Sequence, residues 1–309
     1  MSQAPLMLLD TGSLYFRAFY GVPENVRSPD GVPVNAIRGL LDMVARLVTT
    51  RRPGRLVACW DDDWRPAFRV AAIPSYKAHR LAPDGGEDVP ESLAAQIPVI
   101  VDVLAALGIP RVGVGGYEAD DVIGALAARE AALTGSRAAV EVVTGDRDLF
   151  QLVDDEVPVR VLYTARGMSD LQVIDQAWLV ERYAVGSGAA YADLAVLRGD
   201  TSDGLPGVAG IGEKTAASLL ARYGDLPGIL AALEAGDDGL SPANRRRLAE
   251  ARDYLAVAPG VVRVATEAPV PEVDDRLPPE PDPERLMALA ERWGLSSSIT
   301  RAVQALAGP

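Results

Sequence analysis

Short apolar runs alternate with segments of helical periodicity through the first half of this chain. Apolar residues recur at helical spacing over residues 36–48, 93–107 (with a kink expected at Pro98) and 120–129. Between them stand the apolar runs, at residues 6–9, 55–60, 111–114, 140–143 and 157–163. Strands that alternate with helices form right-handed βαβ units. The pattern therefore predicts the α/β class, with a mostly parallel central sheet flanked by helices.

Acidic residues gather where these runs end. Asp10 and Asp61 each follow an apolar run, and tighter sets stand at residues 118–121, 146–148 and 200–203. In open parallel sheets, sites form outside the carboxyl ends of the strands, where such side chains meet. The nine acidic residues are Asp10, Asp61, Glu118, Asp120, Asp121, Asp146, Asp148, Asp200 and Asp203.

These carboxylates point to a metal site. Like charges brought close together raise each other's pKa, and a cation removes that cost. Oxygen ligands suit Mg²⁺ or Mn²⁺, and two such ions support phosphodiester hydrolysis. A single Asp at a strand end is more often a helix N-cap. Nine acids in five segments favour the metal interpretation, so we predict a metal-dependent phosphoryl-transfer enzyme.

The formal net charge of −13 argues at first against a nucleic-acid partner. Nine of the negative charges belong to the carboxylates above, and residues 267–284 add a net six. Without these two groups, the remaining net charge of the chain does not oppose DNA binding. Of 30 basic residues only Lys77 and Lys214 are lysines, and both stand in the motifs described below.

The single His79 and the single Cys59 exclude several kinds of site. One histidine cannot build a His-rich zinc site, and no nucleophile motif stands near it. One cysteine cannot form an intrachain disulfide, and residues 1–5 lack the features of a signal peptide. No apolar run reaches the roughly 18 residues of a membrane span. A cytoplasmic protein with no membrane partner is expected.

From about residue 175 the periodicity becomes helical, with helices expected at 176–183, 189–197, 214–223, 226–235 and 242–255. A glycine-rich stretch, residues 205–216, joins two of them. It is not a P-loop, because Glu213 stands between the last glycine and Lys214. It fits a helix–hairpin–helix, which grips backbone phosphates; a plain tight turn is the alternative. The candidate DNA-binding residues are Gly207, Gly210, Ile211, Gly212, Lys214 and Thr215.

Residues 64–91 are polar and interleave cations with aromatic residues, in Phe68-Arg69 and Tyr76-Lys77. This pattern suits single-stranded nucleic acid, although alone it is more often a solvated charged face. Lys77 and Arg80 would lie one turn apart if this stretch were helical.

Several motifs occur together in a fixed order. They are Asp-x-Gly near the start, Phe-Arg with Tyr-Lys-x-x-Arg, GYEADD at 116–121, TGDRDL at 144–149, and GDTSDGLPG followed by GIGEKTA over 199–216. In this order they resemble the 5′-nuclease (flap endonuclease) family, and most of all the 5′–3′ exonuclease domain that begins bacterial DNA polymerase I. The resemblance runs from about residue 6 to residue 264.

The resemblance implies a PIN-like fold, a two-metal site that hydrolyses phosphodiesters at flaps and 5′ ends, a helical arch, and a hairpin that holds duplex, usually with K⁺. Carried over by position, Asp10, Asp61, Glu118 and Asp120 serve one metal region. The other five acids complete it or hold the second metal. Lys77 and Arg80 correspond to arch cations near the scissile phosphate, and Arg17 to a phosphate contact.

The chain departs from the family pattern at three places. Thr11 separates Asp10 from Gly12, and Gly204 stands where Asn is common. The second strand ends in Asp61-Asp62-Asp63, one residue longer than usual, so Asp62 is an alternative to Asp61 as the ligand. No polymerase domain follows, which leaves a stand-alone nuclease or a fragment.

We therefore expect a nuclease domain over 1–173 with an arch region at about 64–91, a helix–hairpin–helix subdomain over 174–264, and an acidic linker with terminal helices over 265–309. The expected activity is Mg²⁺-dependent, structure-specific 5′ cleavage of flapped or nicked DNA by a monomer, including removal of RNA primers, in replication and repair. Alternatives are a non-catalytic DNA-binding relative, a phosphatase with Asp10 as nucleophile, and an RNA-directed nuclease.

Overall fold

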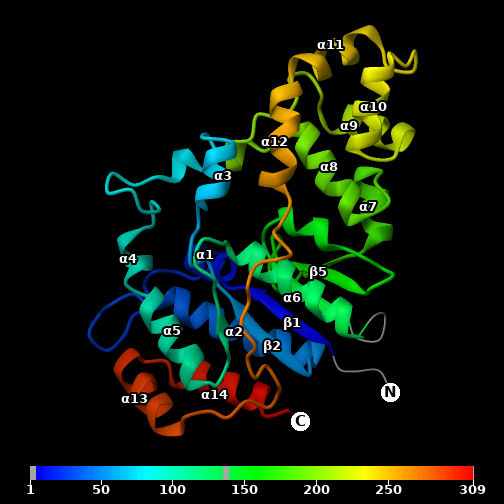
Figure 1. Ribbon diagram of the computed structural model, residues 1–309. Coiled ribbons are helices and arrows are strands. Elements are labelled where there is room, and N and C mark those ends of the chain that lie inside the picture. Colours follow the sequence, from blue (N-terminus) through cyan, green and yellow to red (C-terminus); the bar gives the residue numbers. More distant parts are fainter. Residues whose placement is uncertain (1–4, 135–138, 309) are drawn as a thin grey trace.

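The computed structural model describes residues 5–134 and 139–308 (Figure 1). The prediction that no signal peptide is present concerns residues 1–5, and of these residues 1–4 lie outside the described part. A six-stranded sheet lies at its centre in the order β3-β2-β1-β4-β5-β6. All neighbouring pairs are parallel except β5 with β6. The predicted α/β class and mostly parallel sheet are confirmed. The strands are β1 (Leu6–Asp10), β2 (Arg55–Cys59), β3 (Arg111–Val112), β4 (Val140–Thr144), β5 (Val159–Tyr163) and β6 (Gln172–Ile174).

The central strand β1 is apolar from Leu6 to Leu9, because helices cover both faces of the sheet. Leu8 is paired with Val57 on β2 and Val142 on β4, and these three side chains enter one core. The alternate residues Met7 and Leu9 enter the other. The helices of this part of the chain are α1 (Thr11–Gly21), α2 (Asn35–Arg51), α3 (Ala67–Ala72), α4 (Glu91–Ala94), α5 (Ile97–Ala106) and α6 (Ala119–Thr134).

Two local expectations in this part were wrong. The helix expected at 93–107 is two helices, α4 and α5, and Pro98 stands in the first turn of α5 instead of at a kink. There its missing N–H removes no intrahelical bond. The edge strand β6 was missed, because three residues are too few to show a period of two.

A second, helical unit stands on one end of the sheet (Figure 1). The helix expected at 242–255 is broken at Ala251, although neither glycine nor proline marks the break. Its helices are α7 (Gln176–Tyr183), α8 (Gly188–Arg198), α9 (Glu213–Tyr223), α10 (Leu226–Ala235), α11 (Pro242–Glu250) and α12 (Arg252–Val262).

After α12 the chain returns to the sheet, drawn in orange in Figure 1. The N–H of Leu56 donates to the carbonyl of Asp275 (2.8 Å), so this segment extends the edge beside β2. The chain then forms α13 (Pro283–Trp293) and α14 (Ser296–Leu306), which pack against α5 and α2. None of the helices in the described residues has the length and apolar character to cross a membrane.

Candidate metal centre and nucleic-acid interface

A cavity of about 520 Å³ opens at the carboxyl edge of the sheet. Asp10 ends β1, while Asp61 and Asp146 follow β2 and β4. Because these strands are adjacent and parallel, their ends meet at one place. Five predicted ligands line the cavity, namely Asp10, Asp61, Glu118, Asp120 and Asp146.

Asp10 is buried and held from two sides. It caps α1 by accepting from the N–H of Ser13 (3.2 Å), and it accepts from the hydroxyl of Thr144 (2.6 Å). Burial, with the charges of Asp61 and Asp146 added, raises the pKa of Asp10 to about 7. The charged form therefore costs free energy until a cation is present.

This shift predicts how pH acts on the metal-free protein. The folded pKa of Asp10 lies above the unfolded value of 3.8, so the folded state binds more protons between these values and stability falls as pH rises through them. Asp10→Asn keeps a capping side chain and removes the charge. In EDTA we expect this variant to be more stable than the parent at pH 8 by up to about 4 kcal/mol. The difference should vanish near pH 4 in urea titrations; an equal difference at both pH values would contradict the assignment.

Asp61 and Asp62 lie in different surroundings. Asp61 accepts from the N–H of Ala119 at the start of α6 (2.9 Å) and lines the cavity. Asp62 forms an ion pair with Arg111 and is not among the lining residues. The geometry therefore favours Asp61 as the ligand.

A matched pair of variants checks this choice. We expect Asp61→Asn to lower the turnover of DNA cleavage by about 10²-fold, the typical cost of removing one transition-state contact. Asp62→Asn should change turnover less than about twofold, because it removes only a half-exposed ion pair. Equal losses in single-turnover cleavage would remove the distinction.

Glu118 and Asp120 come from the start of α6. The hydroxyl of Tyr76 donates to both oxygens of Glu118 (2.9 and 3.0 Å), and Lys77 Nζ lies 3.0 Å from Oε2. Burial raises the pKa of Glu118 to about 7. Loss of water contact, then the charges of Asp10 and Asp146, raise the pKa of Asp120 well above its usual range.

Asp121, although next to Asp120, does not face the cavity. Its side chain is fully buried, and its two oxygens accept from the guanidinium of Arg69 (2.6 and 2.7 Å). They also accept from the N–H groups of Glu118 and Ala265. Protein donors occupy its acceptor positions in this structure, which does not favour the predicted role of Asp121 as a metal ligand.

The remaining acids form a second set beside the cavity. Asp200 accepts from Ser202 and Arg147, and these bonds outweigh burial and lower its pKa. Asp203 pairs with Arg80 at 2.8 Å. Burial and the charges of Asp146, Asp203 and Asp200 raise the pKa of Asp148. Across residues 5–134 and 139–308, no three acidic, Cys or His side chains are already placed to hold one ion.

The stretch 64–91 carries its cations on a turn instead of a long helix. Ala78–Arg80 forms one 3₁₀ turn, and Lys77 before it is left-handed at φ 48°. Lys77 and Arg80 both line the cavity. The condition of one helix carrying both residues is therefore not met in the structure.

Gly204 explains how this turn is held. The N–H of Lys77 donates to the carbonyl of Asp203 (2.9 Å), and the hydroxyl of Ser75 donates to that of Gly204 (2.8 Å). Gly204 has φ 71°, and a Cβ there would lie 2.1 Å from the carbonyl oxygen of Ser75. The glycine that departs from the family pattern is thus required by this close approach.

Arg17 lies at the rim. Its Nη2 donates to the carbonyl of Ala165 (3.0 Å), while the adjacent Phe16 lines the cavity. The structure therefore places Arg17 near the cavity without placing it in the lining.

The predicted hairpin joins α8 to α9. Gly207 and Gly210 have φ 64° and 80°, and Ile211 is buried in the core. Gly212 is the N-cap of α9, so the exposed Lys214 lies in its first turn, as does Thr215. The N–H groups of this turn and the Lys214 ammonium form a surface suited to a phosphate.

Several residues of the site were not predicted. Thr144 and Ser13 hold Asp10, and Tyr76 holds Glu118. Arg147 lines the cavity and joins the two acidic sets through Asp200. One signal was available, because Arg147 stands between Asp146 and Asp148 and a cation flanked by acids is placed to pair with them.

Comparisons with known proteins agree with this arrangement. Residues 5–184 match the family model "5'-3' exonuclease, N-terminal resolvase-like domain" and residues 187–284 match "5'-3' exonuclease, C-terminal SAM fold". The chain is similar to a 5′–3′ exonuclease of Streptomyces coelicolor, with 59% identity over 97% of this chain and 99% of that protein. It is also similar to DNA polymerase I of Mycobacterium tuberculosis, with 42% identity over 79% of this chain and 26% of the polymerase.

Solved structures show the same fold. The T5 5′-exonuclease with bound zinc superposes with a TM-score of 0.66 at 18% identity, covering 98% of both chains. The catalytic core of Rad2 in complex with DNA substrate gives a TM-score of 0.59 at 16% identity, covering 98% of this chain and 92% of that one.

Proposed function

Because this chain belongs to the 5′–3′ exonuclease family, we propose that it is a Mg²⁺-dependent 5′–3′ exonuclease and flap endonuclease acting on DNA in replication and repair. One observation carries the proposal: five carboxylates from adjacent strand ends and α6 line one cavity together with Lys77 and Arg80. Such a site places metal ligands and phosphate-binding cations together.

The residues fit divalent metal ions. All donors are carboxylate oxygens, the type that Mg²⁺ and Mn²⁺ prefer. Burial first, and then the neighbouring carboxylates, raise the pKa values of Asp10 and Asp120, and for Asp120 the Lys77 ammonium offsets only part of this shift. A bound cation would lower the free-energy cost of ionising them. Bound ions would supply an activated water and stabilise the leaving oxygen. We propose that Asp10, Asp61, Glu118, Asp120 and Asp146 serve the region of the first ion, directly or through its bound waters, with Asp148, Asp200 and Asp203 toward a second.

The cations of the chain bind the substrate. The Lys77 ammonium faces the cavity, and its contacts with Glu118 outweigh burial and raise its pKa, so it stays charged at neutral pH. Arg80, paired with Asp203, lies beside it. Together they orient a phosphate from a 5′ strand against the carboxylates, while Arg17 at the rim contacts the next phosphate along.

The hairpin grips the duplex part of the same substrate. Lys214→Ala is expected to weaken duplex binding and to lower its salt slope by about one unit, because one phosphate contact is lost. Fluorescence anisotropy at several salt concentrations measures both quantities. Arg292→Ala, an exposed cation on α13, is the control and should leave the slope unchanged. An unchanged slope for Lys214→Ala would show that the hairpin does not contact phosphate.

One assay tests the proposed function. A 5′-flap DNA, a nicked duplex and an RNA-primed duplex are each incubated with and without Mg²⁺. We expect cleavage of all three only with the metal, leaving 5′-phosphates. Binding without cleavage in Mg²⁺ and in Mn²⁺ would instead identify a non-catalytic relative, and hydrolysis of small phosphomonoesters alone would identify a phosphatase. Potassium at the hairpin and a monomeric state stay predictions, to be tested in the same buffers and by light scattering.

A further inference from the structure

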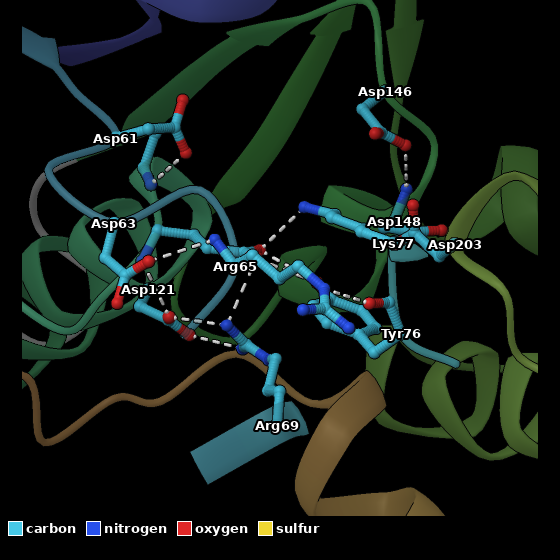
Figure 2. A network of polar contacts seen from close by, with 12 residues as sticks. Asp61, Asp63, Arg65, Arg69, Tyr76, Lys77, Asp121, Asp146, Asp148 and Asp203 are labelled. Atoms are coloured by element: carbon cyan, nitrogen blue, oxygen red, sulfur yellow. Dashed lines mark hydrogen bonds and ion pairs between the residues drawn. The ribbon is translucent and has the colours of Figure 1, made fainter. Parts of the chain in front are cut away.

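A buried arginine lies where three distant segments of the chain meet. Arg69, in α3, is 2% exposed, and Figure 2 shows its guanidinium directed at Asp121 on α6. Nη1 and Nη2 donate to the two oxygens of that carboxylate (2.7 and 2.6 Å). Two parallel bonds of this kind fix orientation as well as distance.

The same two side chains hold the end of the helical unit. Arg69 Nε donates to the carbonyl of Val261 (2.9 Å) and Nη2 to that of Arg263 (3.3 Å). Asp121 Oδ1 accepts from the N–H of Ala265 (2.7 Å). The last turn of α12 and the chain that leaves it are therefore bonded to the pair.

α12 in turn is bonded to the hairpin helices. It packs along α8, and the hydroxyl of Tyr254 donates to the carbonyl of Val196 (3.0 Å). α8 is followed by the 3₁₀ turn Thr201–Asp203 and then by the hairpin that carries Lys214. If DNA binding displaces the hairpin, the displacement can therefore be transmitted to Arg69 through the packed helices α8 and α12.

On its other side the pair reaches the cavity. Asp121 Oδ2 accepts from the N–H of Glu118 (3.1 Å), and Arg69 Nη1 lies 3.5 Å from Glu118 Oε2. That carboxylate also holds Tyr76 and Lys77, which follow Arg69 in the same segment. The pair therefore fixes both the metal-side carboxylate and the stretch that carries the phosphate-binding cation.

A buried ion pair is weak evidence for stability, because desolvation offsets its attraction. An ion pair that is hydrogen-bonded to three segments and to the candidate site is suited to holding these parts in position relative to one another. We propose that Arg69 is a positioning residue, which couples duplex binding at the helical unit to the placement of Glu118 and Lys77 in the cavity. This inference rests on the function proposed above.

Two substrates separate coupling from plain structural support. One is a 5′-flap duplex long enough to reach the hairpin, and the other is a short single strand with no duplex. In Arg69→Lys, which keeps the charge but loses the forked contact, we expect kcat on the flap duplex to fall about tenfold. Its Kd for duplex and its kcat on the single strand should stay within about twofold of the parent. Equal losses on both substrates would overturn the proposal.

A double-mutant cycle gives the second readout. If Arg69 transmits duplex binding, Lys214→Ala lowers kcat on the flap duplex in the parent and has no further effect on kcat in Arg69→Lys. Additive effects would contradict the coupling. Asp121→Asn, which keeps the shape of the side chain, should reproduce the substrate-dependent loss even if Arg69→Lys does not fold.

The matched control is Arg51→Lys. Arg51 pairs with Glu141 between α2 and β4, away from the cavity, and should keep the parent ratio of the two activities. If the parent cleaves neither substrate with Mg²⁺, the proposed function fails. If the parent cleaves both and Arg69→Lys keeps the parent ratio, only the coupling fails.

Discussion

Asp120→Asn is expected to lower the turnover of flap cleavage by about 10²- to 10³-fold, the cost of removing one transition-state contact. Asp120 lies in the first turn of α6 and lines the cavity. In the described part of the chain nothing donates a hydrogen bond to its carboxylate, so the change breaks no structural contact. Single-turnover cleavage with saturating enzyme measures the loss.

The same variant should keep its fold and its affinity for DNA. Removing a charge that Asp10 and Asp146 oppose should leave the melting temperature of the metal-free protein unchanged or raised. Duplex Kd should stay within about twofold, because the hairpin is untouched. A variant that melts earlier and loses DNA binding with activity would mean that Asp120 supports the fold.

Lys77→Ala is expected to reduce turnover by about 10²-fold while changing duplex affinity little. The ammonium is largely buried beside Glu118, whereas the hairpin is the element proposed to hold the duplex. Removing it takes positive charge from the cavity in which we propose that the scissile phosphate binds. Arg80→Ala should cost less, since Arg80 is partly exposed and paired with Asp203.

Rates at saturating substrate and separate binding titrations check the Lys77 prediction. Arg292→Ala, on α13, serves as the charge-matched control and should match the parent in both. Loss of affinity with unchanged turnover would make Lys77 a binding contact that plays no part in the transition state.

The sequence pattern was sufficient to predict which acidic residues meet at the ends of the strands. Asp10, Asp61 and Asp146 follow strands that turned out to be adjacent and parallel, so alternation of strands and helices places them together. The pattern was not sufficient to predict which of Asp120 and Asp121 faces the cavity. Successive helical residues point about 100° apart, so one faces the cavity and the other the interior. Which is which depends on Arg69, which is 52 residues from Asp121 in sequence.

Other features also depended on contacts distant in sequence. In the sequence, Gly204 is only a departure from the family pattern. In the structure, the carbonyl of Ser75 occupies the space that a Cβ at this position would need. Asp61 and Asp62 are equivalent in the sequence, and contacts with distant residues separate them. Asp61 accepts from the N–H of Ala119, whereas Asp62 pairs with Arg111 on β3. The break of α11 from α12 at Ala251 has no local signal.

We propose that the carboxylates of this cavity hold the divalent ions used for cleavage. Anomalous diffraction from crystals soaked in Mn²⁺ tests it most directly. We expect at least one Mn²⁺ peak among Asp10, Asp120 and Asp146, absent from crystals of Asp120→Asn at the same concentration. Peaks only outside the cavity, in a protein that cleaves flap DNA with Mn²⁺ in solution, would show that these carboxylates do not hold the catalytic ions.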